Sequence, residues 1–286
     1  MSRIFYLNGR YLPREEAHVS VEDRGYLFGD GVYEVLEIHR GALIDEDRHW
    51  QRLDRSLSEL RISWPIGQAA FGRVLREVKA RNKVENGFLY IQITRGAAPR
   101  EHVFPAQNVR PSLLVSARPV DPRKGEAQAQ KGIGVISLPD LRWKRVDIKT
   151  INLLPNVLAK QAAKEEGATE AWLFDEEGLV TEGAASNAWI IDENRTIHTH
   201  PVDHSILRGI TRTTLIDIIA AKGYALKERR FSLAEARAAR EAFITGALSL
   251  VMPVVRIDGK PIGEGVPGPI ATELRRIFHD TASRTL

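Results

Sequence analysis

The sequence of 286 residues contains no cysteine. This absence excludes disulfide bonds, thiolate metal ligands and a cysteine nucleophile, and it is compatible with a reducing compartment. No apolar stretch reaches the roughly 18 to 20 residues that span a bilayer, so a membrane partner is not expected. The first residues carry no long apolar run, and a secretory signal is therefore not expected either. These absences together predict a cytoplasmic location.

Motifs of nucleotide binding and of serine hydrolases are also missing. The chain has no G-x-S-x-G elbow, no G-x-x-x-x-G-K-[ST] loop and no strand-anchored G-x-G-x-x-G. His198 and His200 alternate on an expected strand, but no further ligand follows at a suitable spacing, so no metal site is predicted. The formal net charge is +4, with acidic and basic residues interleaved, and this argues against a nucleic-acid partner.

The remaining composition is that of a folded globular chain, with 27% charged residues and 43% from the AVILMFWYC set. The length predicts one large or two medium domains. Proline, glycine and polar residues mix after position 118, as is typical of a linker. We therefore expect a smaller α/β amino-terminal domain at residues 1–119, a linker at 120–125 and a larger β-rich domain at 126–286.

Periodicity and turn residues predict the main elements. Asn8-Gly9 between apolar alternations favours a type I′ hairpin, and Ser232 with Glu235 forms a capping-box pattern. Helices are expected at 46–62, 69–81, 156–166, 213–222 and 269–283, and strands at 88–95, 112–118 and 132–139.

Lys149 follows a short β-like run and precedes Asn152, Pro155 and an expected helix. Local patterns alone favour a solvated lysine at a loop edge, although structure on both sides would hold it in place. Tyr33 follows the glycine-rich turn at Gly29 and begins a strand, where a plain tight turn is the simpler interpretation.

Several further residues have both a structural and a functional interpretation. Thr211 opens a helix after Gly209, which suits an ordinary N-cap or a phosphate site. Arg52 is a surface charge or an anion ligand beside an apolar helix stripe, and Glu182 lies where a strand runs into a turn. An amine, an anion and phosphate donors are what pyridoxal phosphate chemistry needs, but these residues alone leave the question open.

Four segments in order resemble the fold-type IV aminotransferases, and within that class the D-amino acid transaminases. They are residues 23–35 (DRGYLFGDGVYEV), 147–161 (DIKTINLLPNVLAKQ), 180–183 (VTEG) and 207–212 (LRGITR). The resemblance implies a two-domain fold of mixed α/β and α+β character, pyridoxal 5′-phosphate as the cofactor between the domains, and a homodimer.

The resemblance also implies roles for individual residues. Lys149 would bind the cofactor covalently and move the substrate proton, and Glu182 would pair with the pyridinium nitrogen. The remaining cofactor-binding positions would be Arg52, Leu207, Ile210, Thr211 and Ala247. The substrate carboxylate would be bound by Tyr33, Arg100 and His102, the last two from the neighbouring subunit.

The chain departs from the D-amino acid enzymes where these commonly carry hydroxyls. The replacing residues are Ala184, Ala185, Gly246, Ala247 and Leu248. We expect backbone N–H groups and water to take over the lost contacts and the pocket to be more apolar.

The predicted function is ping-pong transamination between a D-amino acid such as D-alanine and 2-oxoglutarate or pyruvate. Arg100 favours amino acids over plain amines, because a guanidinium offers two parallel donors to a carboxylate. Alternatives are an (R)-amine or branched-chain amino acid aminotransferase and an aminodeoxychorismate lyase. An alternative of a different class is a protein that keeps the cofactor or an anion without turnover.

Overall fold

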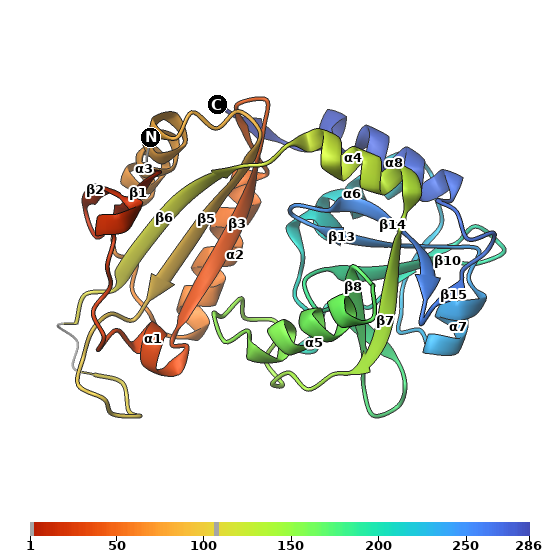
Figure 1. Ribbon diagram of the computed structural model, residues 1–286, viewed down its shortest axis with the longest axis horizontal. Helices are drawn as coiled ribbons and strands as arrows, with labels where there is room; N and C mark the ends of the chain where they lie inside the picture. Colours follow the sequence, from red (N-terminus) through yellow and green to blue (C-terminus); the bar gives the residue numbers. More distant parts are fainter. Residues whose placement is uncertain (1–2, 106–108) are drawn as a thin grey trace. The chain divides into compact units, whose positions relative to one another are not determined.

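The computed structural model describes residues 3–105 and 109–286, which group into two compact units. The ranges of the first unit are Met1–Pro122, Ile148–Asn152 and Ser283–Leu286, and those of the second are Arg123–Asp147 and Leu153–Ala282. Each unit contains its own β-sheet (Figure 1). Lys149 thus groups with the first unit, whereas the expected second domain ran without interruption from 126 to 286.

Most of the expected linker at 120–125 is helical. Helix α4, Pro122–Lys131, starts inside it. Proline is favoured in the first turn of a helix, where its missing N–H group leaves no intrahelical bond unmade, and Arg, Lys, Glu, Ala and Gln then propagate the helix. The boundary between the two units, after Pro122, falls within the expected linker, which is helical from Pro122 onward.

The first unit is built on a seven-stranded antiparallel sheet in the order β16-β4-β3-β5-β6-β1-β2 (Figure 1). Its strands are β1 Ile4–Leu7, β2 Arg10–Pro13, β3 Gly31–His39, β4 Ala42–Ile44, β5 Gly87–Thr94, β6 Ser112–Pro119 and β16 Arg284–Thr285. Its helices are η1 Arg14–Glu16, α1 Arg24–Phe28, α2 Glu46–Glu59 and α3 Gln68–Arg81. The expected first hairpin is confirmed, since Asn8 and Gly9 both have positive φ between β1 and β2.

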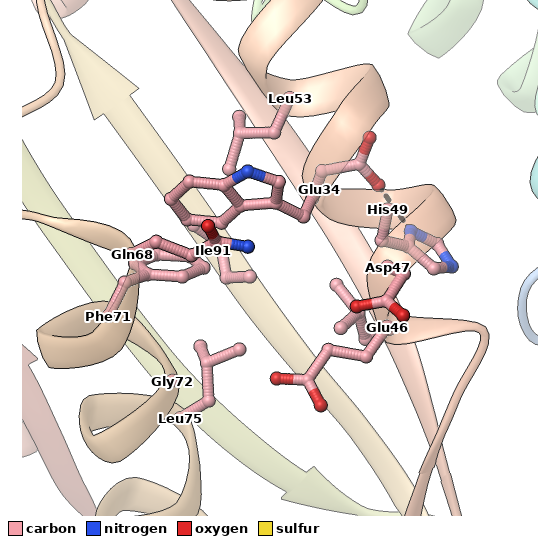
Figure 2. Close-up of a pocket in the computed structure, with 12 residues that line it drawn as sticks. Glu34, Glu46, Asp47, His49, Leu53, Gln68, Phe71, Gly72, Leu75 and Ile91 are labelled. Carbon is pink, nitrogen blue, oxygen red and sulfur yellow. Dashed lines mark hydrogen bonds and ion pairs between the residues drawn. The ribbon is translucent and has the colours of Figure 1, made fainter. Parts of the chain in front are cut away.

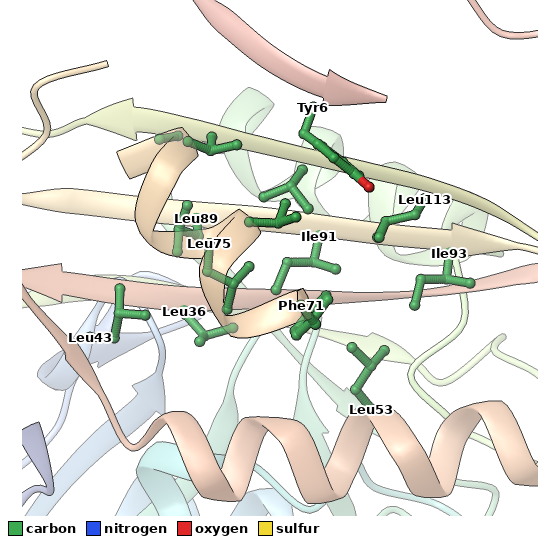
Figure 3. Packing of buried hydrophobic residues seen from close by; sticks show 14 of the residues in the cluster. Tyr6, Leu36, Leu43, Leu53, Phe71, Leu75, Leu89, Ile91, Ile93 and Leu113 are labelled. Carbon is green, nitrogen blue, oxygen red and sulfur yellow. The ribbon is translucent and has the colours of Figure 1, made fainter. Parts of the chain in front are cut away.

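The core of the first unit lies between one face of this sheet and helices α2 and α3. Figure 3 shows Leu53 of α2 and Phe71 and Leu75 of α3 against strand residues that point the same way. The labelled strand residues are Tyr6, Leu36, Leu43, Leu89, Ile91, Ile93 and Leu113. Alternate β3 residues point to the opposite face, as expected for Tyr33, Val35 and Glu37.

The second unit contains a nine-stranded mixed sheet in the order β12-β11-β10-β13-β14-β7-β8-β9, with β15 paired to β14. Its strands are β7 Ile133–Pro139, β8 Glu170–Phe174, β9 Val180–Gly183, β10 Asn187–Ile191, β11 Ile197–Thr199, β12 Leu226–Glu228, β13 Glu241–Gly246, β14 Leu250–Ile257 and β15 Lys260–Pro261. Its helices, besides α4, are α5 Leu154–Glu165, α6 Ile210–Ala221, α7 Leu233–Ala238 and α8 Pro269–Thr281. Parallel pairing joins β7 to β8 and β14, and β11 to β12.

Two details of the second unit bear on the predicted elements. The capping box is confirmed, because Ser232 accepts from the Glu235 N–H while the Glu235 side chain accepts from the Ser232 N–H. Helix α6 begins at Ile210, before the predicted Thr213. Gly209 is extended at φ −60° and ψ 138°, so the helix can start directly after it without a side-chain cap.

Every helix within residues 3–105 and 109–286 is too short or too polar to cross a membrane.

Candidate active site

Lys149 lies in an extended segment beside the first residues of β3. Tyr33 N–H donates to the Lys149 carbonyl at 3.0 Å, and Ile151 N–H donates to the Gly31 carbonyl at 3.1 Å. The Lys149 side chain is directed over Tyr33, with Nζ 4.1 Å from the ring centroid. The lysine is therefore half-buried and held from both sides, in contrast to a freely solvated loop residue.

The ring of Tyr33 contacts a second tyrosine, Tyr90 of β5. The rings of Tyr33 and Tyr90 lie 5.9 Å apart, and the Tyr90 hydroxyl donates to Gln92 Oε1 at 2.7 Å. Burial raises the pKa of Tyr90 to about 12. Its hydroxyl therefore stays protonated and can act only as a neutral hydrogen-bonding group at ordinary pH.

Arg52 extends from α2 toward Glu34, which lies on the opposite face of β3 from Tyr33. Its Nε and NH2 atoms lie 2.7 and 2.8 Å from the two carboxylate oxygens of Glu34. His49 Nδ1 lies 2.7 Å from Glu34 Oε2. The carboxylate thus fixes the plane and direction of the guanidinium, in the parallel two-bond geometry that Arg and a carboxylate favour.

Glu34 is fully buried, and its ionisation depends on these neighbours. Burial raises the pKa of Glu34, but the charge of Arg52 and the hydrogen bonds from Arg52 and His49 outweigh this effect and hold the pKa far below its usual range. Burial lowers the pKa of His49, so its neutral ring donates Nδ1–H to Glu34.

A cavity of about 40 Å³ adjoins this ion pair (Figure 2). Glu34 and His49 meet on one side of it, and Phe71, Leu75 and Ile91 form apolar walls. Ligand pockets typically measure about 300 to 1,000 Å³, so this space suits a water molecule and is too small for a cofactor.

Arg100 and His102 lie on the exposed loop that follows β5. Both contact Phe28 of α1: the Arg100 guanidinium carbon is 5.3 Å from the ring centroid, and the His102 ring centroid is 5.5 Å away. Tyr33, the third expected carboxylate ligand, contacts Lys149. Within the first unit, the expected substrate ligands are therefore Arg100 and His102 beside Phe28, and Tyr33 beside Lys149.

Glu182 lies at the end of β9 in the second unit, only 4% exposed. Three donors converge on its carboxylate. Arg142 NH1 lies 2.5 Å from Oε1, while Asn187 Nδ2 and the Leu207 N–H donate to Oε2 at 2.8 and 3.1 Å. Leu207, an expected cofactor-binding position, thus also orients Glu182 through its backbone.

The electrostatics of Glu182 reflect competition between burial and Arg142. Burial raises the pKa of Glu182 to about 7, although the Arg142 charge lowers it in part. Asp140 holds the same guanidinium from another side, with Nε to Oδ1 at 2.9 Å and NH2 to Oδ2 at 2.7 Å. One positive charge therefore serves two carboxylates, and Glu182 can strongly stabilise a further cation.

Asn187 links Glu182 to the start of α6. Its Nδ2 also donates to the Leu207 carbonyl at 2.9 Å, and a Cβ built on Gly209 would lie 2.1 Å from its Oδ1. Only glycine fits this close approach. Because Gly209 supplies no side-chain cap, the N–H groups at Ile210 and Thr211 point beyond the helix end, where an anion is favoured.

The turn after β13 lies beside the turn that precedes β10. A Cβ on Gly246 would lie 2.9 Å from Ser249 Oγ and 3.4 Å from the Ala185 carbonyl. Ala247 follows in this turn, half-buried, while Ala184 is buried and its N–H donates to the Ala171 carbonyl. The positions that lack the expected hydroxyls are thus adjacent within the second unit.

Sequence patterns missed three residues of these clusters. Glu34 follows Tyr33 directly, so its period-2 position on the core face could have been recognised as an unusual buried acid. Asn187 follows Glu182 by one turn, but nothing local distinguishes it from a turn residue. Arg142 lies in a basic stretch that resembles solvated surface. Only its burial in the folded chain shows that it is the ion-pair partner of Glu182.

Comparison with known proteins connects these clusters to one family. The family model for class IV amino-transferases matches residues 31–257. D-alanine aminotransferase of Bacillus licheniformis is 42% identical over 274 residues, covering 96% of this chain and 95% of the relative. D-alanine aminotransferase of Staphylococcus haemolyticus is 39% identical over 279 residues, covering 98% and 97%.

Solved structures agree with this relationship. The T.th. branched-chain amino acid aminotransferase with pyridoxamine 5′-phosphate is 29% identical, with a TM-score of 0.88 over 98% of this chain and 94% of that one. The Escherichia coli branched-chain enzyme has a TM-score of 0.90 at 23% identity over 98% and 94%, which shows the shared fold. The sequence match over residues 31–257 and these similarities show that the chain belongs to the class IV aminotransferase family.

Proposed function

We propose that this protein is a pyridoxal 5′-phosphate-dependent aminotransferase that moves an amino group between a D-amino acid, such as D-alanine, and a 2-oxo acid in a ping-pong cycle. The observation that carries the proposal is the environment of Glu182, a buried carboxylate with three donors and a pKa of about 7. The D-alanine aminotransferases that match nearly the whole chain support the choice of substrate.

The donor set fits the cofactor. Gly209 allows the close approach of Asn187, which also binds Glu182, and it precedes helix N–H groups suited to a phosphate. Arg52 is a pre-oriented guanidinium, Glu182 is an anion for a ring nitrogen, and Lys149 is a half-buried amine. When bound, pyridoxal 5′-phosphate supplies an aldehyde that condenses with amines and a ring that withdraws electrons from the substrate Cα.

Each of the residues named above would have a separate role. Lys149 Nζ would hold the cofactor and would be the base that moves the proton from the substrate Cα. Glu182 would keep the ring nitrogen protonated, and the charge of Arg142 opposes the rise in the Glu182 pKa that burial causes. Arg52, with the N–H groups of Ile210 and Thr211 and the backbone at Ala247, would hold the phosphate.

Substrate recognition would depend on the carboxylate. Tyr33, Arg100 and His102 offer a hydroxyl, a two-donor guanidinium and an imidazole. We propose a homodimer in which the loop bearing Arg100 serves the other subunit's site. Large apolar side chains exposed on the first unit support a buried subunit interface: Val19, Val21, Tyr26, Val103 and Phe104. Sedimentation equilibrium that gives only a monomer would contradict the dimer.

The location would be cytoplasmic, which the lack of cysteine supports.

A donor panel tests the reaction. D-alanine, L-leucine and (R)-1-phenylethylamine are each offered with 2-oxoglutarate, because pyruvate as acceptor would only regenerate D-alanine, and D-alanine is expected to be preferred. The branched-chain alternative has specific support in the apolar turn Gly246-Ala247-Leu248 and in the 29% identity to the T.th. branched-chain enzyme. A preference for L-leucine would replace our choice, and no half-reaction with any donor would indicate a non-catalytic binding protein.

Lys149→Ala tests the chemistry itself. The variant should lose both transamination and the absorbance of lysine-bound cofactor, whereas Lys144→Ala, at an exposed lysine five positions earlier, should keep both. Retention of both properties by Lys149→Ala would refute the assigned role.

A further inference from the structure

Arg24 is a buried arginine whose charge lies under the loop that carries Arg100 and His102. It is 3% exposed and is the first residue of α1, after the N-cap Asp23. Its NH1 donates to the Glu101 carbonyl at 2.6 Å, and its Nε donates to Asp30 Oδ2 at 2.8 Å. The guanidinium thus fixes the residue between the two expected carboxylate ligands.

The ring of Phe28 connects the same groups from the side. The Arg24 guanidinium carbon lies 4.8 Å from its centroid, and Arg100 and His102 also contact this ring. Cations and imidazoles favour aromatic faces and edges, so the ring restricts where both side chains can point.

This arrangement is anchored to the body of the first unit. Asp30 also accepts from Arg95, at 2.7 Å to Nε and 2.9 Å to NH2. Arg95 in turn donates to the carbonyls of Leu60 and Arg61 at 2.8 and 3.1 Å. Arg24 is therefore the link through which a fixed acid–arginine network reaches the Glu101 carbonyl.

The start of the loop is fixed as well. Arg24 N–H donates to the Gly96 carbonyl at 2.9 Å, and Ala98 N–H donates to the Glu22 carbonyl at 3.2 Å. Beyond Ala98, Arg100 and His102 are exposed and the backbone is irregular. A hydrogen bond to the Glu101 carbonyl in this stretch bears directly on the direction of both side chains.

We propose that Arg24 is a positioning residue for substrate recognition, which holds Arg100 and His102 in the arrangement that binds the substrate carboxylate by hydrogen bonding to the Glu101 carbonyl and packing on Phe28. The inference rests on the proposed function, because it assumes that these two residues bind the substrate. Arg24 itself contacts neither substrate nor cofactor in this role. Specificity for amino acids would then depend on a residue remote from the chemistry.

The test compares Arg24→Met with wild type in the cofactor-loaded enzyme. Misplacement of a binding group by about 1 Å can cost about 100-fold, so we expect KM for D-alanine to rise about 10- to 100-fold while kcat falls far less. Hydrogen exchange at residues 97–104 and trypsin cleavage after Arg100 should both become faster. Arg24→Lys, which keeps a charged donor, should restore part of the loop protection.

Two further variants keep the test decisive. Phe28→Leu removes the shared ring at a half-buried site and should also raise KM and the rate of hydrogen exchange in the loop. If Arg24→Met does not fold, this variant tests whether contacts of Arg24 with the loop position Arg100 and His102. Arg61→Met is the matched control. The Arg61 guanidinium also contacts an aromatic ring of this loop, that of Phe104, with its carbon 4.9 Å from the ring centroid. This variant should leave KM within about two-fold of the wild-type value.

The outcomes separate this inference from the proposed function. Unchanged KM, or a higher KM with unchanged exchange at 97–104, would overturn the role of Arg24, and so would a fall in kcat alone. If wild type fails to transaminate D-alanine, the proposed function fails, while loop exchange in Arg24→Met still reports whether Arg24 holds the loop.

Discussion

Arg142 and Glu182 form a buried ion pair in which NH1 and Oε1 lie 2.5 Å apart and the two side chains are 5% and 6% exposed. Asp140 shares the same guanidinium, so Glu182 receives only part of its charge. The carboxylate consequently keeps a raised pKa of about 7 and gains most from a further positive partner. A protonated pyridine nitrogen would be such a partner.

Replacing Arg142 by methionine should weaken both folding and cofactor binding. Removing one partner of a buried ion pair typically costs about 3 to 5 kcal/mol, because the other charge stays buried without compensation. We expect a comparable loss in the free energy of unfolding and about 10- to 100-fold weaker binding of pyridoxal 5′-phosphate, as for other groups that orient a ligand-binding residue. Urea unfolding and a fluorescence titration would measure the two effects.

The matched control is Arg145→Met in the same loop. Arg145 pairs with Asp147 at 3.0 Å, but its side chain is 38% exposed. Its loss should therefore cost about 1 kcal/mol or less. Equal effects of the two variants would contradict the special position of Arg142.

Glu182→Gln should change how the stability of the cofactor-free protein depends on pH. The folded-state pKa is raised from 4.5 to about 7, so between these values the folded protein binds more protons than the unfolded chain. Its stability should therefore fall as pH rises through this window, by about 3 kcal/mol in total for a shift of this size.

Glutamine does not titrate, so urea unfolding of Glu182→Gln at a series of pH values should lack this fall. Glu177→Gln, with a side chain 70% exposed, should retain it. Parallel stability curves for wild type and Glu182→Gln would show that Glu182 ionises normally.

Glu34→Gln should destabilise the first unit and release Arg52. Glutamine keeps the size of the side chain but removes the charge that holds the guanidinium, and we expect a loss of about 3 to 5 kcal/mol in the free energy of unfolding. The contribution of Glu34 is present at neutral pH and declines under acid, because its folded pKa is lowered. The acid limb of a wild-type stability curve should therefore flatten in the variant.

Glu59→Gln provides the comparison on the same helix as Arg52. Glu59 and Arg55 form an exposed i,i+4 pair at 3.5 Å, which should be worth at most about 0.5 kcal/mol. A cost for Glu34→Gln no greater than this would mean that the buried pair is easily replaced.

Gly209→Ala should disturb the link between Asn187 and α6. The added methyl would lie 2.1 Å from Asn187 Oδ1 and 3.3 Å from Arg212 Cβ, so neighbouring groups must move at a cost of about 1 to 3 kcal/mol. Because φ is −60°, the effect would be steric and not a strain of the backbone. Cofactor affinity should fall together with thermal stability.

Gly67→Ala controls for the loss of glycine at a helix N-cap. Gly67 caps α3 with φ −71° and ψ 157°, and a Cβ there would meet nothing within 4 Å. Its substitution should have little effect on stability and none on cofactor affinity. If both variants behave alike, the close approach to Asn187 is unimportant.

Local sequence was sufficient for most helices and for the first hairpin. Apolar spacing at Leu53 and Leu57 predicted α2, and the Asn8-Gly9 pair predicted its turn, because these signals act over a few residues. The helix that begins at Pro122 was not predicted, since proline at a helix start and proline in a loop are locally indistinguishable.

The family and the order of the segments that carry Lys149, Glu182 and the start of α6 could be predicted from the sequence, since these are contiguous motifs. The surroundings of these residues depend on the tertiary fold. Arg142 reaches Glu182 across 40 positions and Arg24 reaches Glu101 across 77, at 2.5 and 2.6 Å. Such contacts depend on which strands and loops pack together, and the resulting burial, which sets the pKa of Glu182, leaves no local pattern in the chain.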